Sequence, residues 1–240
     1  SLHAKLSIIV ICRNEAHRIE ASLASLKDEL SGLTSQTGEP EFDFEIIVVD
    51  GGSSDATIEL VLRAGIKVVM CEPGRGRQLR KGAMTATGDW FLFLHADTRL
   101  EAGWAKIVAE QISERPDHMA AFQLAFEERS ILLDLIAFGA NLRTRLRSLP
   151  YGDQGVLISA KNYETLGGYK EMPLFEDVDF VDRFTSAFGR SKLDLLTGKA
   201  MTSSARYAVG PLKRVFRNAT CLRMYRAGKP LDQIVRAYET

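Results

Sequence analysis

The stretch of sequence that decides the fold reads Leu6-Ser-Ile-Ile-Val-Ile-Cys12, and Arg13-Asn14-Glu15 follows it at once. A run of β-branched apolar residues is typical of a strand that is buried on both faces. Helical spacing of apolar residues follows from Ala16 to Leu26. The chain is therefore predicted to open with a buried strand and then a helix.

The same succession returns twice further along the chain. Predicted strands cover Phe44 to Val49, Ile66 to Cys71 and Trp90 to Leu94. A helix capped by Ser54 or Asp55 is predicted between the first two of these strands. A second helix, from Arg77 to Thr87, is predicted between the last two. Strands that alternate with helices form parallel sheets. This half of the chain predicts an α/β protein.

The later half is less regular. It predicts a strand at Met119 to Phe126, a helix at Ser130 to Leu146 and a strand at Val156 to Ser159. We expect these to form an α+β annex within one domain that covers residues 1–240.

Composition narrows the function. The 31 basic and 31 acidic side chains cancel, so no overall field attracts nucleic acid, and we expect no nucleic-acid partner. The longest apolar runs are far shorter than the roughly 20 residues of a membrane-spanning helix. Three cysteines match no metal-binding spacing, and buried thiols in a reducing cytoplasm fit them best.

Polar residues follow three of the predicted strands. They are Arg13-Asn14-Glu15, Asp50-Gly51-Gly52-Ser53-Ser54-Asp55 and His95-Ala96-Asp97. Any one of these could merely cap a helix or make a tight turn. In an open parallel sheet, however, ligands bind beyond the carboxyl ends of the strands. The joint placement therefore predicts a ligand site at one edge of the sheet.

The residue types indicate which ligand this site takes. Gly51 and Gly52 let a flat group approach the backbone, and Asp50 could accept a hydrogen bond from a base or ribose. Asp97 ends an apolar strand, where a carboxylate favours a hard cation such as Mg²⁺ or Mn²⁺ that substrate phosphates help to bind.

A basic turn precedes the next predicted helix. Gly74-Arg75-Gly76-Arg77 could bind an anion through free N–H groups and guanidinium groups, or could be a solvated turn. It matches neither the phosphate-loop signature nor the dinucleotide fingerprint.

Taken in order, these motifs resemble the family 2 glycosyltransferases of the GT-A fold. The set is completed by Gly152-Asp153-Gln154-Gly155 and Glu176-Asp177, although acids in a first helical turn often only complement the helix dipole. The chain looks closest to a compact bacterial subgroup with a similar Gly-Arg-Gly-Arg-Gln stretch, a His-Ala-Asp metal motif and a Ser-Ala-Arg segment, here Ser204-Ala205-Arg206.

The resemblance implies a Rossmann-like three-layer sandwich with a mostly parallel central sheet. Residues 1–100 would be the nucleotide-sugar-binding half and residues 101–240 the acceptor and catalytic half. The activity implied is inverting, metal-assisted sugar transfer from a nucleotide-diphospho-sugar, with UDP-sugar favoured, to a glycan, lipid or small molecule.

The resemblance also assigns roles to residues. Asp97 would hold the metal, and Asp177, with Glu176 beside it, would act on the acceptor. Gly152, Asp153 and Gln154 would bind the acceptor. The donor nucleotide would be bound by Arg13, Asn14, Glu15, Asp50, Gly52, Ser53, Arg75, Arg77, His95 and Ala96. The family's metal motif usually begins with Asp where this chain has His95, which leaves fewer carboxylates for a cation.

Several alternatives stay open at this level. A sugar nucleotidyltransferase would be expected to carry a Gly-rich basic loop after the first strand, and Arg13-Asn14-Glu15 is not one. A non-catalytic nucleotide-binding module could keep the fold without turnover. The apolar helix at Ser130 to Asn141 and the stretch from Pro211 to Tyr238 favour ordinary packing, but either could meet a membrane surface from the cytoplasmic side or a second copy.

Overall fold

A computed structural model describes residues 4–33, 43–147, 150, 154–207 and 210–239. The first elements are β1 (Lys5–Cys12), α1 (Ile19–Gly32), β2 (Asp43–Asp50), α2 (Thr57–Arg63), β3 (Lys67–Met70), α3 (Arg75–Thr85), β4 (Trp90–His95) and β5 (Thr98–Leu100). Then follow α4 (Trp104–Glu114), β6 (Met119–Phe126), α5 (Ile131–Arg147), β7 (Val156–Ser159), α6 (Ala160–Thr165) and α7 (Glu176–Phe188). The last are η2 (Arg190–Lys192), β8 (Leu193–Thr202), η3 (Ser204–Tyr207), α8 (Pro211–Arg226) and α9 (Leu231–Glu239).

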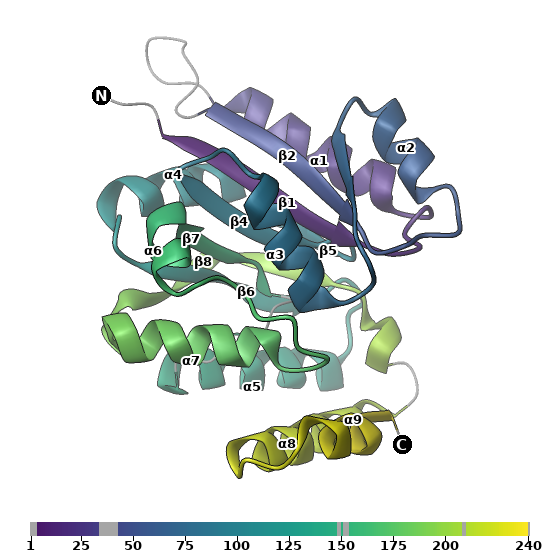
Figure 1. Ribbon diagram of the computed structural model, residues 1–240, viewed down its shortest axis with the longest axis vertical. Coiled ribbons are helices and arrows are strands. Elements are labelled where there is room, and N and C mark those ends of the chain that lie inside the picture. The colour runs from purple at the N-terminus through teal and green to yellow at the C-terminus, as the bar shows by residue number, and fades with distance from the viewer. Residues whose placement is uncertain (1–3, 34–42, 148–149, 151–153, 208–209, 240) are drawn as a thin grey trace.

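All eight described strands join one sheet in the order β3-β2-β1-β4-β7-β6-β8-β5. The pairs among β3, β2, β1 and β4 are parallel, as is β6 with β8, while β7 and β5 run antiparallel to their neighbours. Helices α3, α6 and α7 cover one face of the sheet, and α1, α4 and α5 lie behind it (Figure 1). The predicted three-layer α/β arrangement with a mostly parallel sheet is confirmed.

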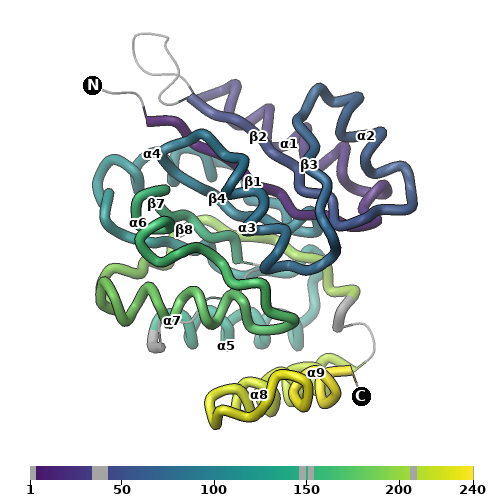
Figure 2. The backbone as a smooth tube through the Cα atoms, viewed as in Figure 1, coloured from purple at the N-terminus to yellow at the C-terminus, as the bar shows by residue number. Residues whose placement is uncertain are grey.

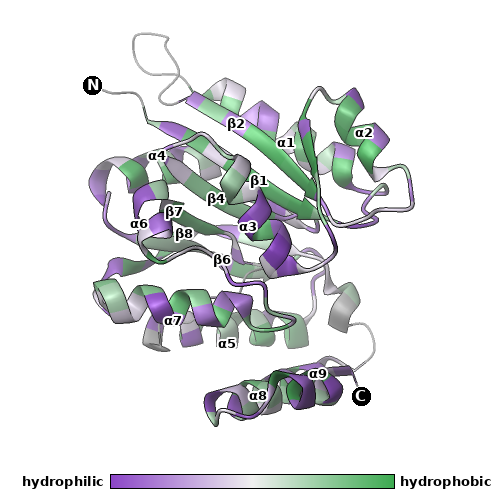
Figure 3. Ribbon diagram, in the orientation of Figure 1, coloured by the Kyte–Doolittle hydropathy of each residue, from purple (hydrophilic) through white to green (hydrophobic). Residues whose placement is uncertain are grey.

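Strand β1 shows why the sheet is buried on both faces. Its side chains alternate: Ile8 and Val10 belong to the core cluster that includes α1, α2 and α4, whereas Ile9 and Ile11 belong to the cluster that includes α3, α6 and α7. Figure 3 shows β1, β2 and β4 as hydrophobic through the centre of the sheet. The continuous apolar run at residues 6–12 therefore satisfies two cores at once.

Three helix starts differ from the sequence prediction. Helix α1 begins at Ile19, because the carbonyl oxygen of Glu15 accepts the N–H groups of Arg18 and Ile19 and closes a turn first. Helix α3 begins two residues early, after Gly74 at φ 144°, a conformation that favours glycine. Ala56 caps α2, although Asp55 Oδ1 still accepts the N–H of Thr57 at 3.0 Å.

The sequence did not predict strands β5 and β8. β8 contains a glycine whose added Cβ would lie 3.0 Å from Ile107 and 3.2 Å from Phe122, so Gly198 serves close packing rather than a turn. Helix α5 packs as expected, with Leu133, Ala137 and Ala140 buried against β6. Helices α8 and α9 pack against each other at one end of the molecule (Figure 2). None of the described helices is long and apolar enough to cross a membrane.

Candidate active site

The polar motifs meet at one edge of the sheet because of the strand directions. β1, β2 and β4 are parallel, so their carboxyl ends share this edge. β6 runs antiparallel to β7, which runs antiparallel to β4, and β8 is parallel to β6. The ends of β6 and β8 therefore lie at the same edge, as does the end of β3, which is parallel to β2. Six strands thus deliver their following residues to this edge.

A crevice of about 160 Å³ opens at this edge. Its lining comes from the end of β1, the end of β4 and the first turn of α3, and consists of Ile11, Cys12, Arg13, Glu15, Arg75, Gln78, His95, Ala96 and Asp97. Six of the predicted donor and metal residues are thus brought together. His95 is buried and Asp97 is half-buried, so the crevice floor is formed by the β4 end.

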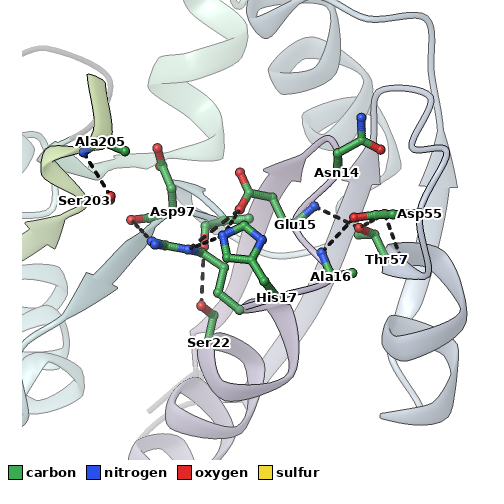
Figure 4. A network of polar contacts seen from close by, with 12 residues as sticks. Asn14, Glu15, Ala16, His17, Ser22, Asp55, Thr57, Asp97, Ser203 and Ala205 are labelled. Carbon is green, nitrogen blue, oxygen red and sulfur yellow. Dashed lines mark hydrogen bonds and ion pairs between the residues drawn. The ribbon is translucent and has the colours of Figure 1, made fainter. Parts of the chain in front are cut away.

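Two carboxylates face this crevice from different strands. The side chains of Glu15 and Asp97 extend toward the same side of the site (Figure 4). The chain turns sharply at Asp97, because β4 lies in the middle of the sheet and β5 pairs at its far edge.

Asp50 organises the neighbouring loop from within the protein. Its side chain is fully buried, and Oδ2 accepts the N–H groups of Gly52 at 2.9 Å and Ser53 at 2.8 Å. Oδ1 accepts the Ser53 hydroxyl and the Cys12 thiol. Both oxygens are thus used inside the protein, where Asp50 holds the turn after β2.

Asn14 joins the loops after β1 and β2. Its backbone is left-handed, with φ 55°. Its N–H donates to Ser53 Oγ at 2.8 Å, and its Oδ1 accepts the N–H of Ser54 at 2.8 Å. These reciprocal hydrogen bonds hold the loops after β1 and β2 together. Asn14 and Ser53 therefore shape the site without lining the crevice.

Helix α3 is locked to the strand ends through Gln78. The Gln78 amide donates to the carbonyl oxygens of Cys12 and Val49, both at 3.0 Å. A Cβ on Gly51 would lie 2.7 Å from Gln78 Oε1, so this contact requires glycine at position 51. The basic first turn of α3 is thereby placed over the site.

The start of α7 closes the other side of α3. A Cβ on Gly76 would lie 2.1 Å from the carbonyl oxygen of Lys170 and 3.3 Å from Cβ of Glu176. Glycine at position 76 thus lets the start of α3 touch both Lys170, in the segment before α7, and Glu176, the first residue of α7. This contact brings Glu176 near Arg75, whose other neighbours include the crevice residues.

Glu176 and Asp177 occupy different surroundings. Glu176 is only 4% exposed, and its burial, then the charge of Asp177, raises its pKa from 4.5 to about 7 against the opposing effect of Arg75. Asp177 is half-buried, and its Oδ1 accepts the N–H of Val178 at 2.8 Å. Asp179 pairs with Lys170 and Arg183 and serves the structure.

Other predicted residues lie elsewhere. Arg77 is exposed and pairs with Glu171 at 3.2 Å rather than lining the crevice. Gln154 is fully buried and donates to the carbonyl oxygen of Phe122 at 3.1 Å. Gly152 and Asp153 lie outside the described residues. Gly52 takes φ 87° in the turn that Asp50 holds.

Arg18 is a site residue that sequence reasoning missed. Its Nε lies 3.8 Å from Glu15 Oε2, and one terminal nitrogen donates to the carbonyl oxygen of Asp97 at 3.1 Å. The same nitrogen lies 3.9 Å from Glu127 Oε2, just after β6. Arg18 thus connects the ends of β1, β4 and β6. Its position three residues after Glu15 was the available signal.

The donor set suits a metal that the substrate helps to hold. No group of three or more His, Cys, Asp or Glu side chains in the described parts of the chain could bind an ion by itself. Glu15 and Asp97 do offer carboxylates in the same crevice. Mg²⁺ and similar cations are commonly bound by one or two carboxylates together with substrate phosphates. The described residues fit that mode.

Comparison with known proteins shows similarity to glycosyltransferases. Residues 7–135, more than half of the chain, match the family described as Glycosyl transferase family 2. A Drosophila melanogaster dolichyl-phosphate beta-glucosyltransferase is 36% identical over 104 residues, which cover 39% of this chain and 31% of that protein. An uncharacterized glycosyltransferase of Rickettsia bellii is 24% identical over 222 residues, covering 89% of this chain and 69% of that protein.

The fold also matches a solved structure. Glucosyl-3-phosphoglycerate synthase from Mycobacterium tuberculosis, in complex with Mn²⁺, UDP and glucosyl-3-phosphoglycerate, superposes with a TM-score of 0.61 at 18% identity. The match covers 95% of this chain and 81% of that one. The predicted GT-A fold is confirmed, and the sequence match adds the family. The chain belongs to the family 2 glycosyltransferases.

Proposed function

We propose that this chain transfers a sugar from a nucleotide-diphospho-sugar, with a UDP-sugar favoured, to an acceptor hydroxyl with inversion of the anomeric carbon. One observation carries the proposal: Glu15, Asp97, Arg13 and Arg75 converge in a single crevice at the carboxyl edge of the sheet. Guanidinium groups bind phosphates, and carboxylates bind a cation that phosphates share. A diphosphate is the ligand that needs both.

The nucleoside would lie against the turn after β2. A Cβ added at Gly52 would meet no atom of the described residues within 4 Å, so this part of the backbone is open to a flat ligand. Asp50 and Asn14 hold the turn, while Ser53 supplies one of its hydroxyls. In this proposal Asp50 shapes the nucleoside site from below.

The diphosphate would lie between Arg75, Arg13 and the two carboxylates. Asp97, with Glu15 near it, would hold a divalent cation, Mn²⁺ or Mg²⁺, through donor phosphates; His95 and Ala96 form the wall. When bound, such a cation neutralises charge that grows on the leaving diphosphate. Arg75 adds a second positive charge at the same place, and buried Glu176 lies near enough to interact electrostatically with its guanidinium.

Transfer itself would need a base on the acceptor side. Asp177 would take the proton of the acceptor hydroxyl as that oxygen bonds to the anomeric carbon, and the bond from this carbon to the diphosphate breaks. Attack from the opposite face inverts the carbon. General-base assistance contributes about 10²–10⁴-fold to such a step. Glu176 is only 4% exposed, whereas Asp177 is half-buried, so Asp177 is the more accessible of the two carboxylates to an acceptor.

Known relatives support the choice of donor. The mycobacterial synthase with the same fold was crystallised with UDP and Mn²⁺. Relatives act on different acceptors by name, including a dolichyl phosphate and a phosphoglycerate, so the acceptor here stays a glycan, a lipid or a small molecule. We place the activity in a reducing cytoplasm because Cys12, Cys71 and Cys221 are all free.

The proposal is tested by thermal unfolding with nucleotides. A ligand that binds only the folded state raises the melting temperature. We expect UDP or UDP-glucose with Mn²⁺ to raise it more than ADP or GDP, and Asp97→Ala to abolish the Mn²⁺-dependent part. Asp43→Ala, at the opposite edge of the sheet, is the matched control and should respond like the wild type.

Donor hydrolysis then separates binding from catalysis. Asp177→Asn should keep the nucleotide-induced shift and lose about 10²–10⁴-fold of UDP release from the UDP-sugar. No shift with any nucleotide would refute the donor site. A normal shift without hydrolysis by the wild type, with any acceptor class, would favour a non-catalytic nucleotide-binding module instead.

A further inference from the structure

Helix α5 carries an apolar stripe on its outer face. Ile131, Leu135, Phe138 and Leu142 are spaced by four, three and four residues, which places them on one side of a helix. They are 84%, 62%, 65% and 41% exposed. The opposite side of α5 is already buried against β6 through Leu133 and Ala137. The stripe is thus additional to the side that the fold uses.

Helix α8 carries a second exposed apolar stripe next to the first. Leu212 and Phe216 are one turn apart and are 65% and 72% exposed, with Val215 beside them. Helices α5 and α8 are in contact. α5 begins five residues after the end of β6, and α8 begins nine residues after the end of β8. Because β6 and β8 end at the sheet edge that holds the candidate active site, both helices are connected to that edge by short segments.

The two helices that carry these stripes have a net positive charge. Residues 211–226 include five basic side chains and no acidic one, and residues 131–147 include three basic and one acidic. Arg145 continues the α5 stripe three residues after Leu142, and Arg223 continues the α8 stripe. Arg145, Arg223 and Lys213 are exposed and form no ion pair within the described part of the chain.

We propose that the outer faces of α5 and α8 form a docking surface for an anionic lipid bilayer. Apolar side chains next to uncompensated basic ones are what an interfacial helix presents to lipid head groups. A second copy of the chain fits less well, because a symmetric contact through this surface would bring the basic side chains of both copies together. Docking would hold the open edge of the sheet near the bilayer.

The test is co-sedimentation with vesicles of phosphatidylcholine alone or mixed with phosphatidylglycerol. The wild type should bind the anionic vesicles and dissociate from them at high salt. It should not bind the neutral vesicles. Leu135→Glu with Phe138→Glu should weaken binding about tenfold or more, because both side chains would have to leave the apolar layer. Leu62→Glu, at a 60% exposed position on α2, is the matched control and should bind like the wild type.

A second variant tests the charges alone. Lys213→Gln with Arg223→Gln should weaken binding to anionic vesicles about tenfold or more, since each basic residue near the surface contributes about 1 kcal/mol. This variant leaves every apolar residue in place, so it stays informative if the double Glu variant does not fold. The nucleotide-induced thermal shift of each variant should remain normal, which separates failed docking from a failed donor site.

Several results would overturn the proposal. They are wild-type protein that ignores anionic vesicles, equal binding to neutral ones, or unchanged binding by both variants. Light scattering supplies one more: a dimer of wild-type protein that the Glu substitutions dissociate, without any vesicle binding, would assign the surface to a second copy.

Discussion

Replacing Gly76 with Ala probes the contact that assembles the site. The added Cβ would lie 2.1 Å from the carbonyl oxygen of Lys170. A backbone carbonyl cannot swing aside as a side-chain end can, so the start of α3 and the segment at Lys170, before α7, must separate by roughly 1 Å to regain ordinary contact. Overpacking of this kind costs about 1–3 kcal/mol, and the better helix propensity of Ala returns at most about 1 kcal/mol.

We expect a net loss of about 1–2 kcal/mol, which lowers the melting temperature by about 2–8 °C in a chain of this size. Gly139→Ala is the matched control, because an added Cβ there meets no described atom within 4 Å. It should raise the melting temperature by about 1–4 °C through helix propensity alone. Thermal and urea unfolding of the two variants measure the difference.

The same pair of variants tests the link to the site. Arg75 and Glu176 flank the contact at Gly76, so Gly76→Ala should also weaken the UDP-induced thermal shift, whereas Gly139→Ala should not. Equal stability of the two variants would refute the packing argument. A destabilised Gly76→Ala protein with normal UDP binding would refute the claim that this contact positions the donor site.

Three further predictions concern charged residues. Because burial raises the pKa of Glu176 to about 7, the folded state binds more protons than the unfolded state between about pH 4.5 and 7. The free energy of unfolding of the wild type therefore falls as the pH rises through this range. Glu176→Gln should thus gain stability relative to the wild type from about pH 5 to 8, on the order of 3 kcal/mol, in urea unfolding; a constant difference contradicts this. Arg18→Ala should lower kcat/KM for donor hydrolysis about tenfold, because Glu15 loses the ion pair that positions it. Arg18→Lys should recover part of this loss. The melting temperature should stay unchanged, since a part-buried charged contact contributes only modestly to stability. Asp50→Ala leaves two N–H groups without their acceptor and should destabilise the fold by about 2–4 kcal/mol, more than Asp50→Asn, again in urea.

The parallel half of the sheet could be predicted because its strands are apolar on both faces. The runs at β1, β2 and β4 carry that signal, and the loops after them must share an edge. β8 could not be predicted in the same way, since Gly198 and Lys199 interrupt its pattern and its register with β6 shifts near Ala121. β5 reaches the far edge of the sheet by pairing with β8, and no pattern in the residues of β5 itself predicts this position.

Site residues were predictable where they follow a parallel strand. Arg13, Glu15 and Asp97 do so, and they line one crevice together with His95, the last residue of β4. Arg18 lies in a turn before α1, where an Arg three residues after a Glu is typical of an ordinary helix start. Glu127 follows β6, whose direction is known only once β7 is seen to pair antiparallel on both sides. Topology, rather than residue type, conceals these two.

The basic turn at the start of α3 shows how one motif can carry two physical requirements. Its glycines were interpreted as parts of an anion site, yet Gly74 is needed for φ 144° at the helix start and Gly76 for contact with Lys170. Arg75 between them lines the crevice, whereas Arg77 pairs outward with Glu171. Of the two arginines, only Arg75 therefore lines the crevice, and Gly76 after it allows the close contact with Glu176. The proposed phosphate binding and the observed helix packing use the same short sequence, so the packing alone does not account for Arg75.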